Sequence, residues 1–218
     1  MVAMTLGAAV MAAVLTSYVT LSRNFTRSLG ITSSTQPPLE SQGRRTLTYF
    51  VQDVQLANGI SGTPSNSSLT LVQPAGTGTK EITYYYNSSC TTATVVTIHG
   101  TNVTMPINSL TRVLYDGTTV TAKTIQENIP PPASPAPPAT HPLPALADGC
   151  YFRYYDSSGN PYDNGSSPYT TVTTYSEGIK QLSLNFSSQA GSKINGTLSP
   201  VYPSASPRLL IRNKQLLP

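Results

Sequence analysis

The sequence predicts an α+β fold, in which a long N-terminal helical stalk packs on an antiparallel β-sheet head. The first observation is that Met1–Leu21 contains no charged side chain. The second is that apolar residues recur at helical spacing within residues 39–58. The third is that the pattern changes to period two within residues 59–218, as expected for half-buried strands.

The first part of the stalk, residues 1–29, combines a membrane-spanning length with small side chains. A helix over Met1–Leu21 is roughly 30 Å long, which matches the hydrocarbon core of a bilayer. Its many Gly and Ala residues allow neighbouring helices to approach closely. We therefore expect this helix to leave the lipid and to pack against copies of itself in a filament core. The residues expected in that contact are Met1, Met4, Leu6, Gly7, Ala8, Val10, Met11, Val14, Leu15 and Tyr18.

Two simpler interpretations of the same segment stay open. A cleaved signal peptide normally carries a basic region before its apolar core, and nothing basic precedes this one. A plain membrane anchor is the other interpretation, but Arg23 and Arg27 follow the segment closely. The positive-inside rule then places the rest of the chain in the cytoplasm, although its composition is that of an extracellular protein. A start upstream of Met1, with a leader, would remove this conflict.

The stalk is expected to break at residues 30–38, where Gly, β-branched residues and the pair Pro37-Pro38 disfavour a helix. A second helix is expected over residues 39–58, and Asn58-Gly59 is its stop signal. The break is either a joint that lets an assembled fibre stretch or an ordinary loop. The apolar face that should cover the sheet consists of Leu47, Phe50, Val51, Val54 and Leu56.

The head, residues 59–218, contains runs rich in Val, Ile, Thr and Tyr, which suit a pleated, half-buried surface. Asp116-Gly117 joins two of these runs and is the strongest hairpin signal of the chain. The candidate strands are Leu69–Gln73, Glu81–Tyr86, Thr94–His99, Thr111–Tyr115, Thr119–Ile125, Tyr151–Tyr155, Thr170–Tyr175, Lys180–Phe186 and Arg208–Arg212.

A proline-rich excursion interrupts the head at residues 129–144, and it is expected to be extended because proline cannot join a ladder. It is a spacer, a ligand for a proline-binding groove, a strap across a neighbouring subunit or a flexible surface loop. Cys90 and Cys150 flank this excursion and are expected to form a disulfide, because an even cysteine count suits an exported chain. Closing so long a loop removes unfolded-state entropy worth roughly 4 kcal/mol.

Two blocks, and less specifically a third stretch near the C-terminal end, carry a family resemblance. The opening MVAMTLGAAVMAAVLTSYVTLSRNF resembles the N-terminal stalk of type IV pilins and type II secretion pseudopilins. Glu40–Gly59 (ESQGRRTLTYFVQDVQLANG) resembles the end of the stalk in the minor-pilin and J-type pseudopilin branch, and Pro207–Lys214 (PRLLIRNK) resembles its last strand less specifically. The rest of the chain is similar only in pattern. The family's Phe-Thr-Leu-x-Glu cleavage motif is absent, so no residue inherits the docking role of its glutamate.

The resemblance implies a structural subunit, and not an enzyme, of an extracellular pilus-like or pseudopilus filament. The implied partners are copies of the chain itself, the inner membrane of a bacterium before assembly, and the pilus or secretion machinery. The implied location is the inner membrane first and the cell surface afterwards. Whether the chain is the main subunit or a minor priming subunit stays open. The alternative of a different class is a membrane-anchored monomeric adhesin or sugar-binding module.

Composition and motifs argue against other chemistries. The net charge of +4 comes from scattered residues, with Arg44-Arg45 the only basic doublet, so no nucleic acid is expected as a partner. His99 and His141 belong to no nucleophile or metal-ligand pattern, and no cofactor-binding motif is present. The stretch Asp156–Gly165 is rich in oxygen ligands, but Pro161 stands where a calcium loop needs Gly. We expect a turn there.

Sugar attachment is the remaining chemical possibility of the sequence. Asn-x-Ser/Thr motifs are frequent, although chance contributes to them in a chain rich in Ser and Thr. The many hydroxyl groups are alternative sites for O-linked sugars, and either modification suits a fibre surface. The candidate N-glycosylation sites are Asn24, Asn66, Asn87, Asn102, Asn164, Asn185 and Asn195.

Overall fold

A computed structural model describes residues 15, 18, 39–62, 64–65, 67–75, 78–89, 91–131, 149–160, 178–189 and 201–211. Leu15 and Tyr18 have helical backbone, and the other described residues form one helix with defined ends and eleven strands. The elements are α2 (Leu39–Leu56), β1 (Gly59–Ser61), β2 (Ser68–Ala75), β3 (Gly78–Asn87), β4 (Thr94–Ile98), β5 (Thr101–Met105), β6 (Ser109–Tyr115), β7 (Val120–Gln126), β8 (Cys150–Tyr155), β9 (Gln181–Gln189), β10 (Val201–Ala205) and β11 (Leu209–Leu210).

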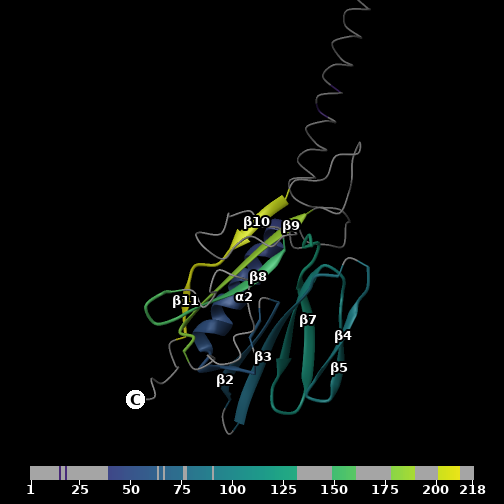
Figure 1. Cartoon of the computed structure of the whole chain (residues 1–218). Coiled ribbons are helices and arrows are strands. Elements are labelled where there is room, and N and C mark those ends of the chain that lie inside the picture. The colour runs from purple at the N-terminus through teal and green to yellow at the C-terminus, as the bar shows by residue number, and fades with distance from the viewer. Residues whose placement is uncertain are drawn as a thin grey trace, which may run out of the picture.

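The strands form three antiparallel sheets (Figure 1). The larger sheet has the order β1-β2-β3-β6-β7. The second sheet is built around β9, which pairs with β8 on one side and with β10 and β11 on the other. The third is the hairpin β4–β5. We call them the five-stranded sheet, the four-stranded sheet and the outer hairpin.

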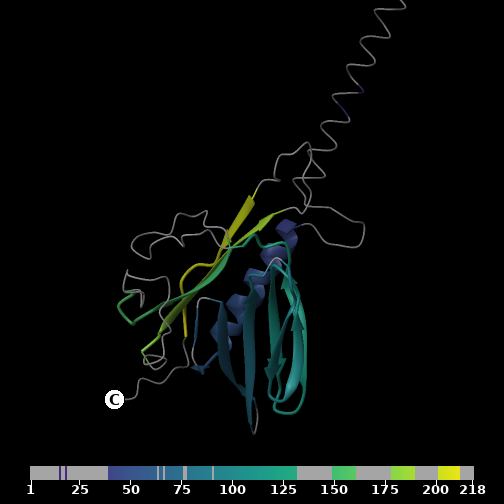
Figure 2. The same ribbon diagram turned by 45° about the vertical axis from the view of Figure 1, so that its right-hand side comes forward.

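Helix α2 lies between the five-stranded and the four-stranded sheets (Figures 1 and 2). It contacts β2 and β7 of the first and β9, β10 and β11 of the second. Phe50 is fully buried at the centre, with its ring 5.5 Å from that of Tyr84 on β3 and 6.2 Å from that of Phe152 on β8. One apolar helix therefore joins both sheets in a single core.

A glycine allows the N-terminal half of α2 to approach the four-stranded sheet closely. A Cβ atom at Gly43 would lie 3.1 Å from the side-chain oxygen of Ser204 and 3.8 Å from the ring of Phe186. The first of these distances, 3.1 Å, is shorter than an ordinary van der Waals contact. The space that Gly43 leaves is thus filled by β9 and β10.

The outer hairpin covers the face of the five-stranded sheet that points away from α2. Val103 and Met105 of β5 pack on Val113 of β6 in a second, smaller core. The hairpin turns at His99-Gly100, where both residues have positive φ angles of 47° and 77°. The central strands β3 and β6 are therefore covered on both faces, by α2 and by the outer hairpin.

The predicted α+β fold with a long helical stalk on a sheet head is wrong. The described residues contain one helix of 18 residues, and 54% of them lie in strands of a mostly antiparallel β structure. The helix is short because Pro37-Pro38 precede it and Asn58-Gly59 follow it. The expected first stalk helix, residues 1–29, and the break at 30–38 lie outside the described residues, apart from Leu15 and Tyr18.

Most local predictions on the described residues are confirmed. Every candidate strand that falls on them overlaps a strand of the structure, whereas Thr170–Tyr175 lies outside them. The turn at Asp116-Gly117 joins β6 and β7, and its carboxylate accepts hydrogen bonds from three donors of Thr118 and Thr119. One residue of the expected helical face is misplaced, because Leu56 is 59% exposed.

The proline-rich excursion begins as part of the core. Ile129 is fully buried and its backbone N–H donates to the carbonyl oxygen of Asn108 over 3.0 Å. The carbonyl of Pro130 accepts a hydrogen bond of 3.1 Å from the hydroxyl of Tyr86. Residues 132–144 of the expected excursion lie outside the described residues.

The central position of Phe50 gives a stability prediction. Replacing Phe50 by Ala should lower the free energy of unfolding by about 3–5 kcal/mol, because it leaves a cavity between Tyr84 and Phe152. Replacing Leu56 on the same helix by Ala should change it by less than about 0.5 kcal/mol, since this side chain is exposed. Urea unfolding followed by circular dichroism measures both. Equal losses for the two variants would contradict the central role of Phe50.

Candidate functional site

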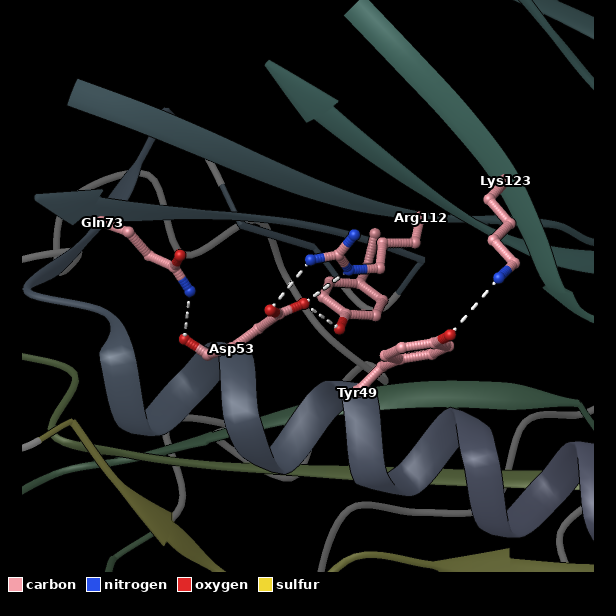
Figure 3. A network of polar contacts seen from close by, with 6 residues as sticks. Tyr49, Asp53, Gln73, Arg112 and Lys123 are labelled. Carbon is pink, nitrogen blue, oxygen red and sulfur yellow. Dashed lines mark hydrogen bonds and ion pairs between the residues drawn. The ribbon is translucent and has the colours of Figure 1, made fainter. Parts of the chain in front are cut away.

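A polar network lies between α2 and the five-stranded sheet (Figure 3). The carboxylate of Asp53 accepts hydrogen bonds from Nε and Nη2 of Arg112 at 2.6 and 2.9 Å. The same carboxylate accepts a third bond of 2.6 Å from the hydroxyl of Tyr84. Because the guanidinium engages both carboxylate oxygens, the pair fixes the orientation of α2 on the sheet as well as its distance.

Two further hydrogen bonds join α2 to the five-stranded sheet. In each, a side chain of one element donates to a main-chain carbonyl of the other. The amide of Gln73 on β2 donates to the main-chain oxygen of Asp53 over 2.9 Å, near the end of the helix where carbonyl groups lack helical partners. The hydroxyl of Thr46 donates to the carbonyl oxygen of Ile125 on β7 over 2.8 Å. The helix is thus tied to β2 and to the edge strand β7, on opposite sides of the centre of the sheet.

Burial and the neighbouring charges set the protonation states in the network. Burial, together with the carboxylate of Asp53, raises the pKa of Tyr84 well above its usual range. The hydrogen bond to Asp53 raises the pKa of Arg112. The phenol is therefore neutral and the guanidinium charged at neutral pH.

An aromatic ring and a second cation form the outer end of the network. Nζ of Lys123 donates to the hydroxyl of Tyr49 over 3.3 Å and lies 5.3 Å from the centre of its ring. Arg112 lies 5.7 Å from the same ring and stands directly opposite Lys123 in the β6–β7 register. Like charges in this position repel, and here Asp53 neutralises one of them. Lys123, through this hydrogen bond and its charge, lowers the pKa of Tyr49.

Sequence reasoning missed this network. Its members are far apart in the chain, since 59 residues separate Asp53 from Arg112. The available signal was an acidic residue on the buried stripe of a helix, one turn after Phe50 and next to Val54. Such an acid needs a cationic or hydrogen-bonding partner, but the sequence does not say which strand supplies it.

The histidine and acidic residues outside the network make structural contacts. Nε2 of His99 lies 2.8 Å from Oε2 of Glu81, and its ring stacks on Tyr115 at 3.8 Å, so it pins the outer hairpin to the five-stranded sheet. His141 lies outside the described residues. Among the residues that the structure describes, no three His, Cys, Asp or Glu side chains gather in a way that would hold a metal ion.

The oxygen-rich stretch after β8 forms the expected turn in its described part. The carboxylate of Asp156 accepts hydrogen bonds of 2.8 Å from the backbone N–H groups of Ser158 and Asn160. The hydrogen bond from the Asn160 side chain to this carboxylate, together with these backbone bonds, lowers the pKa of Asp156. The carboxylate thus serves the turn itself.

The expected disulfide stays a prediction. Cys150 is buried in the core at the start of β8 and has no disulfide partner among the described residues, and burial raises the pKa of its thiol. Cys90 lies outside the described residues.

Three of the candidate glycosylation sites lie on described residues, and Asn87 is unsuited to modification. Its Nδ2 atom is buried and donates to the carbonyl oxygens of Thr92, Met105 and Pro106 at 3.0–3.3 Å. The amide nitrogen to which a sugar would be attached is therefore already bound to the outer hairpin and its flanking residues. Asn102 and Asn185 are also described, whereas Asn24, Asn66, Asn164 and Asn195 lie outside the described residues.

Two of the expected filament-core residues are described. Leu15 and Tyr18 are helical and exposed by 60% and 69%. Met1, Met4, Leu6, Gly7, Ala8, Val10, Met11 and Val14 lie outside the described residues. Within the part of the chain that the structure describes, no helix is both long and apolar enough to cross a membrane.

The chain was compared with protein-family models, with curated proteins and with solved structures, and none of them matches. The pilin and pseudopilin resemblance therefore stays a prediction from the sequence.

The ion pair beneath α2 gives a second stability prediction. Arg112→Met and Asp53→Asn should each lower the free energy of unfolding by about 2–3 kcal/mol, because each leaves a buried partner unsatisfied. The double variant should lose less than the sum, with a coupling of at least about 1 kcal/mol. Lys123→Met is the matched control on the facing strand and should change stability by less than about 0.5 kcal/mol. A coupling near zero would contradict the assignment.

The buried phenol gives a prediction for alkaline pH. Because the pKa of Tyr84 is raised on folding, its neutral form favours the folded state, and this contribution is fully present below pH 10, the usual tyrosine pKa. It is lost as the pH rises from about 10 towards the raised folded-state pKa. The free energy of unfolding should therefore fall with pH above 10, and it should fall less steeply in Tyr84→Phe. Parallel slopes in urea unfolding at pH 9–11 would contradict this.

Proposed function

We propose that this chain is a structural subunit of an extracellular filament of the type IV pilus or pseudopilus kind, which polymerises through its apolar N-terminal segment. The observation that carries the proposal is the charge-free stretch Met1–Leu21, rich in small side chains and followed by Arg23. Small side chains favour close helix packing in a membrane and in a helical bundle alike.

The exposure of Leu15 and Tyr18 supports this proposal. The two residues are three positions apart in a helix, so their side chains lie on the same face. Full burial of one such side chain stabilises an assembly by about 1.5–3 kcal/mol. In the single chain these side chains contact water, and a lipid phase or neighbouring copies of the segment would remove them from it.

The construction of the head is consistent with a subunit that keeps its shape in a fibre. Helix α2 is fixed between two sheets by the Phe50 core, the Asp53–Arg112 pair and the Thr46 hydrogen bond. A membrane-anchored monomeric adhesin shares the apolar segment, so the two functions differ in one property: whether the chain assembles.

A charge placed in the apolar segment tests the proposal. Leu15→Glu should abolish filaments, because burying an unpaired carboxylate between packed helices costs several kcal/mol. Leu210→Glu is the matched control, since Leu210 is a similarly exposed leucine (53%) on β11, and its filaments should persist. Electron microscopy of material sheared from the producing cells measures filaments, and immunoblots of the membrane fraction show whether each variant is made and retained.

The outcomes separate the two functions. Filaments of the Leu15→Glu variant at normal abundance would overturn assembly through this segment. Absence of filaments from cells that hold the unaltered chain in the membrane, with retained binding to a surface or glycan, would favour the monomeric adhesin instead.

A further inference from the structure

We propose that Asn102 is an N-glycosylation site, at which a sugar is attached to the outer hairpin. The motif Asn-x-Ser/Thr begins at seven of the twelve asparagines of the chain, and Ser and Thr make up 56 of its 218 residues. Chance placement would give about three such motifs. The excess gives a reason to ask which motifs the folded chain offers to solvent.

Modification requires two free groups at each motif. The amide Nδ2 atom forms the new bond, and the hydroxyl group two residues later is the other part that the motif specifies. Both must be accessible to an enzyme. Burial and hydrogen bonds of these two groups therefore distinguish one motif from another on the described residues.

The motif at Asn87 is unsuitable because its amide nitrogen is not accessible. This side chain is 4% exposed, and its Nδ2 atom donates to three main-chain carbonyl oxygens. Attachment of a sugar would replace one of the two N–H hydrogens that serve these bonds and would force the buried nitrogen away from the outer hairpin. The folded chain does not offer Asn87.

The motif at Asn185 is unsuitable because its hydroxyl group is not accessible. Asn185 stands in β9 between Tyr151 of β8 and Ala205 of β10. The hydroxyl of its motif belongs to Ser187, which is fully buried and accepts a hydrogen bond of 3.1 Å from the backbone N–H of Gly149. This motif is enclosed in the four-stranded sheet.

The motif at Asn102 meets both requirements. Asn102 and Thr104 are exposed, and because they are two residues apart in β5 they lie on the same outward face. Val103 between them points inward and is buried against the five-stranded sheet. A sugar on this face would leave the small core beneath the hairpin intact.

Hydrogen bonding also leaves the reactive atom of Asn102 available. Its Oδ1 atom accepts a bond of 2.8 Å from the hydroxyl of Thr97 on the facing strand β4. Within the part of the chain that the structure describes, its Nδ2 atom has no hydrogen-bond partner. The side-chain oxygen of Asn102 is therefore engaged in a hydrogen bond, whereas its side-chain nitrogen has none with the described residues. The site lies close to the turn at His99-Gly100.

The chemistry is a group transfer from a lipid-linked sugar diphosphate, catalysed by an oligosaccharyl transferase. A bond forms between Nδ2 of Asn102 and the anomeric carbon of the sugar, and the bond from that carbon to the diphosphate oxygen breaks. The amide gives one proton to a basic group of the transferase, and the lipid diphosphate leaves. The inference rests on export of the head, which the proposed function includes, and not on filament assembly.

Mass spectrometry of the chain from the cells that produce it tests the inference. Trypsin cleaves after Lys80 and Arg112, so a single peptide carries both Asn87 and Asn102. Electron-transfer fragmentation should place an added sugar mass on Asn102 and none on Asn87. The mass should disappear in Asn102→Gln and in Thr104→Val, and should remain in Thr104→Ser, which keeps the hydroxyl at the same position.

Each outcome decides the inference. An unmodified Asn102 in chains recovered from the cell surface would overturn it, and so would a sugar on Asn87 in the same peptide. Chains are taken both from sheared material and from the membrane fraction. Sugar on Asn102 without filaments would support this inference and contradict the proposed function, and filaments with unmodified Asn102 would do the reverse.

Discussion

The structure depends on the position of one helix, because α2 supplies the apolar side chains on which both larger sheets pack. Phe50 contacts Tyr84 of the five-stranded sheet and Phe152 of the four-stranded sheet, so a single side chain joins three elements that are far apart in sequence. Tyr84 and Phe152 also contact each other at 6.2 Å. A shift of the helix along its axis would open the core on both sides at once.

The polar network explains how this position is specified. Apolar contacts are non-directional and allow a helix to rotate or slide at little cost. The two hydrogen bonds between Asp53 and Arg112 have fixed directions, and Tyr84 adds a third to the same carboxylate. Asp53 follows Phe50 by one helical turn, so the same rotation of α2 that places the ring in the core places the carboxylate on β3 and β6. A buried ion pair contributes little net stability, and its value here is the choice of one geometry.

Local chemistry made part of this fold predictable. Pro37-Pro38 and Asn58-Gly59 delimit α2, and Asp116-Gly117 marks the β6–β7 turn, because each of these signals acts within a few residues. Strands β1, β5 and β10 were not predicted, and β10 contains Pro203, which is tolerated since β10 pairs only with β9 among the described strands. The exposure of Leu56 was also not predicted. Helical periodicity identifies the apolar face of a helix, but it does not show where the sheet that covers this face ends.

The polar network was not predicted, and the fold class was predicted wrongly, for a different reason. Arg112 has no local feature that distinguishes it from a surface arginine on a half-buried strand, and its partner lies on another element. In the same way, the residue patterns of β8 and β9 do not reveal that these strands form a second sheet on the far side of α2. Long-range pairing decides both, and a single sequence contains no direct record of it.

The layered head has a consequence for assembly. The outer hairpin covers Val113 and its neighbours on one face of the five-stranded sheet, and α2 covers the other face. The outward face of the outer hairpin carries the polar side chains of Thr97, Asn102 and Thr104 around one exposed apolar residue, Val95, and such a mixed surface does not favour association with another protein. Large apolar side chains that stay exposed on the described head, such as Val95, are separated from one another along the chain. A head built in this way adds little apolar attraction between copies, which is consistent with association directed to the apolar segment Met1–Leu21.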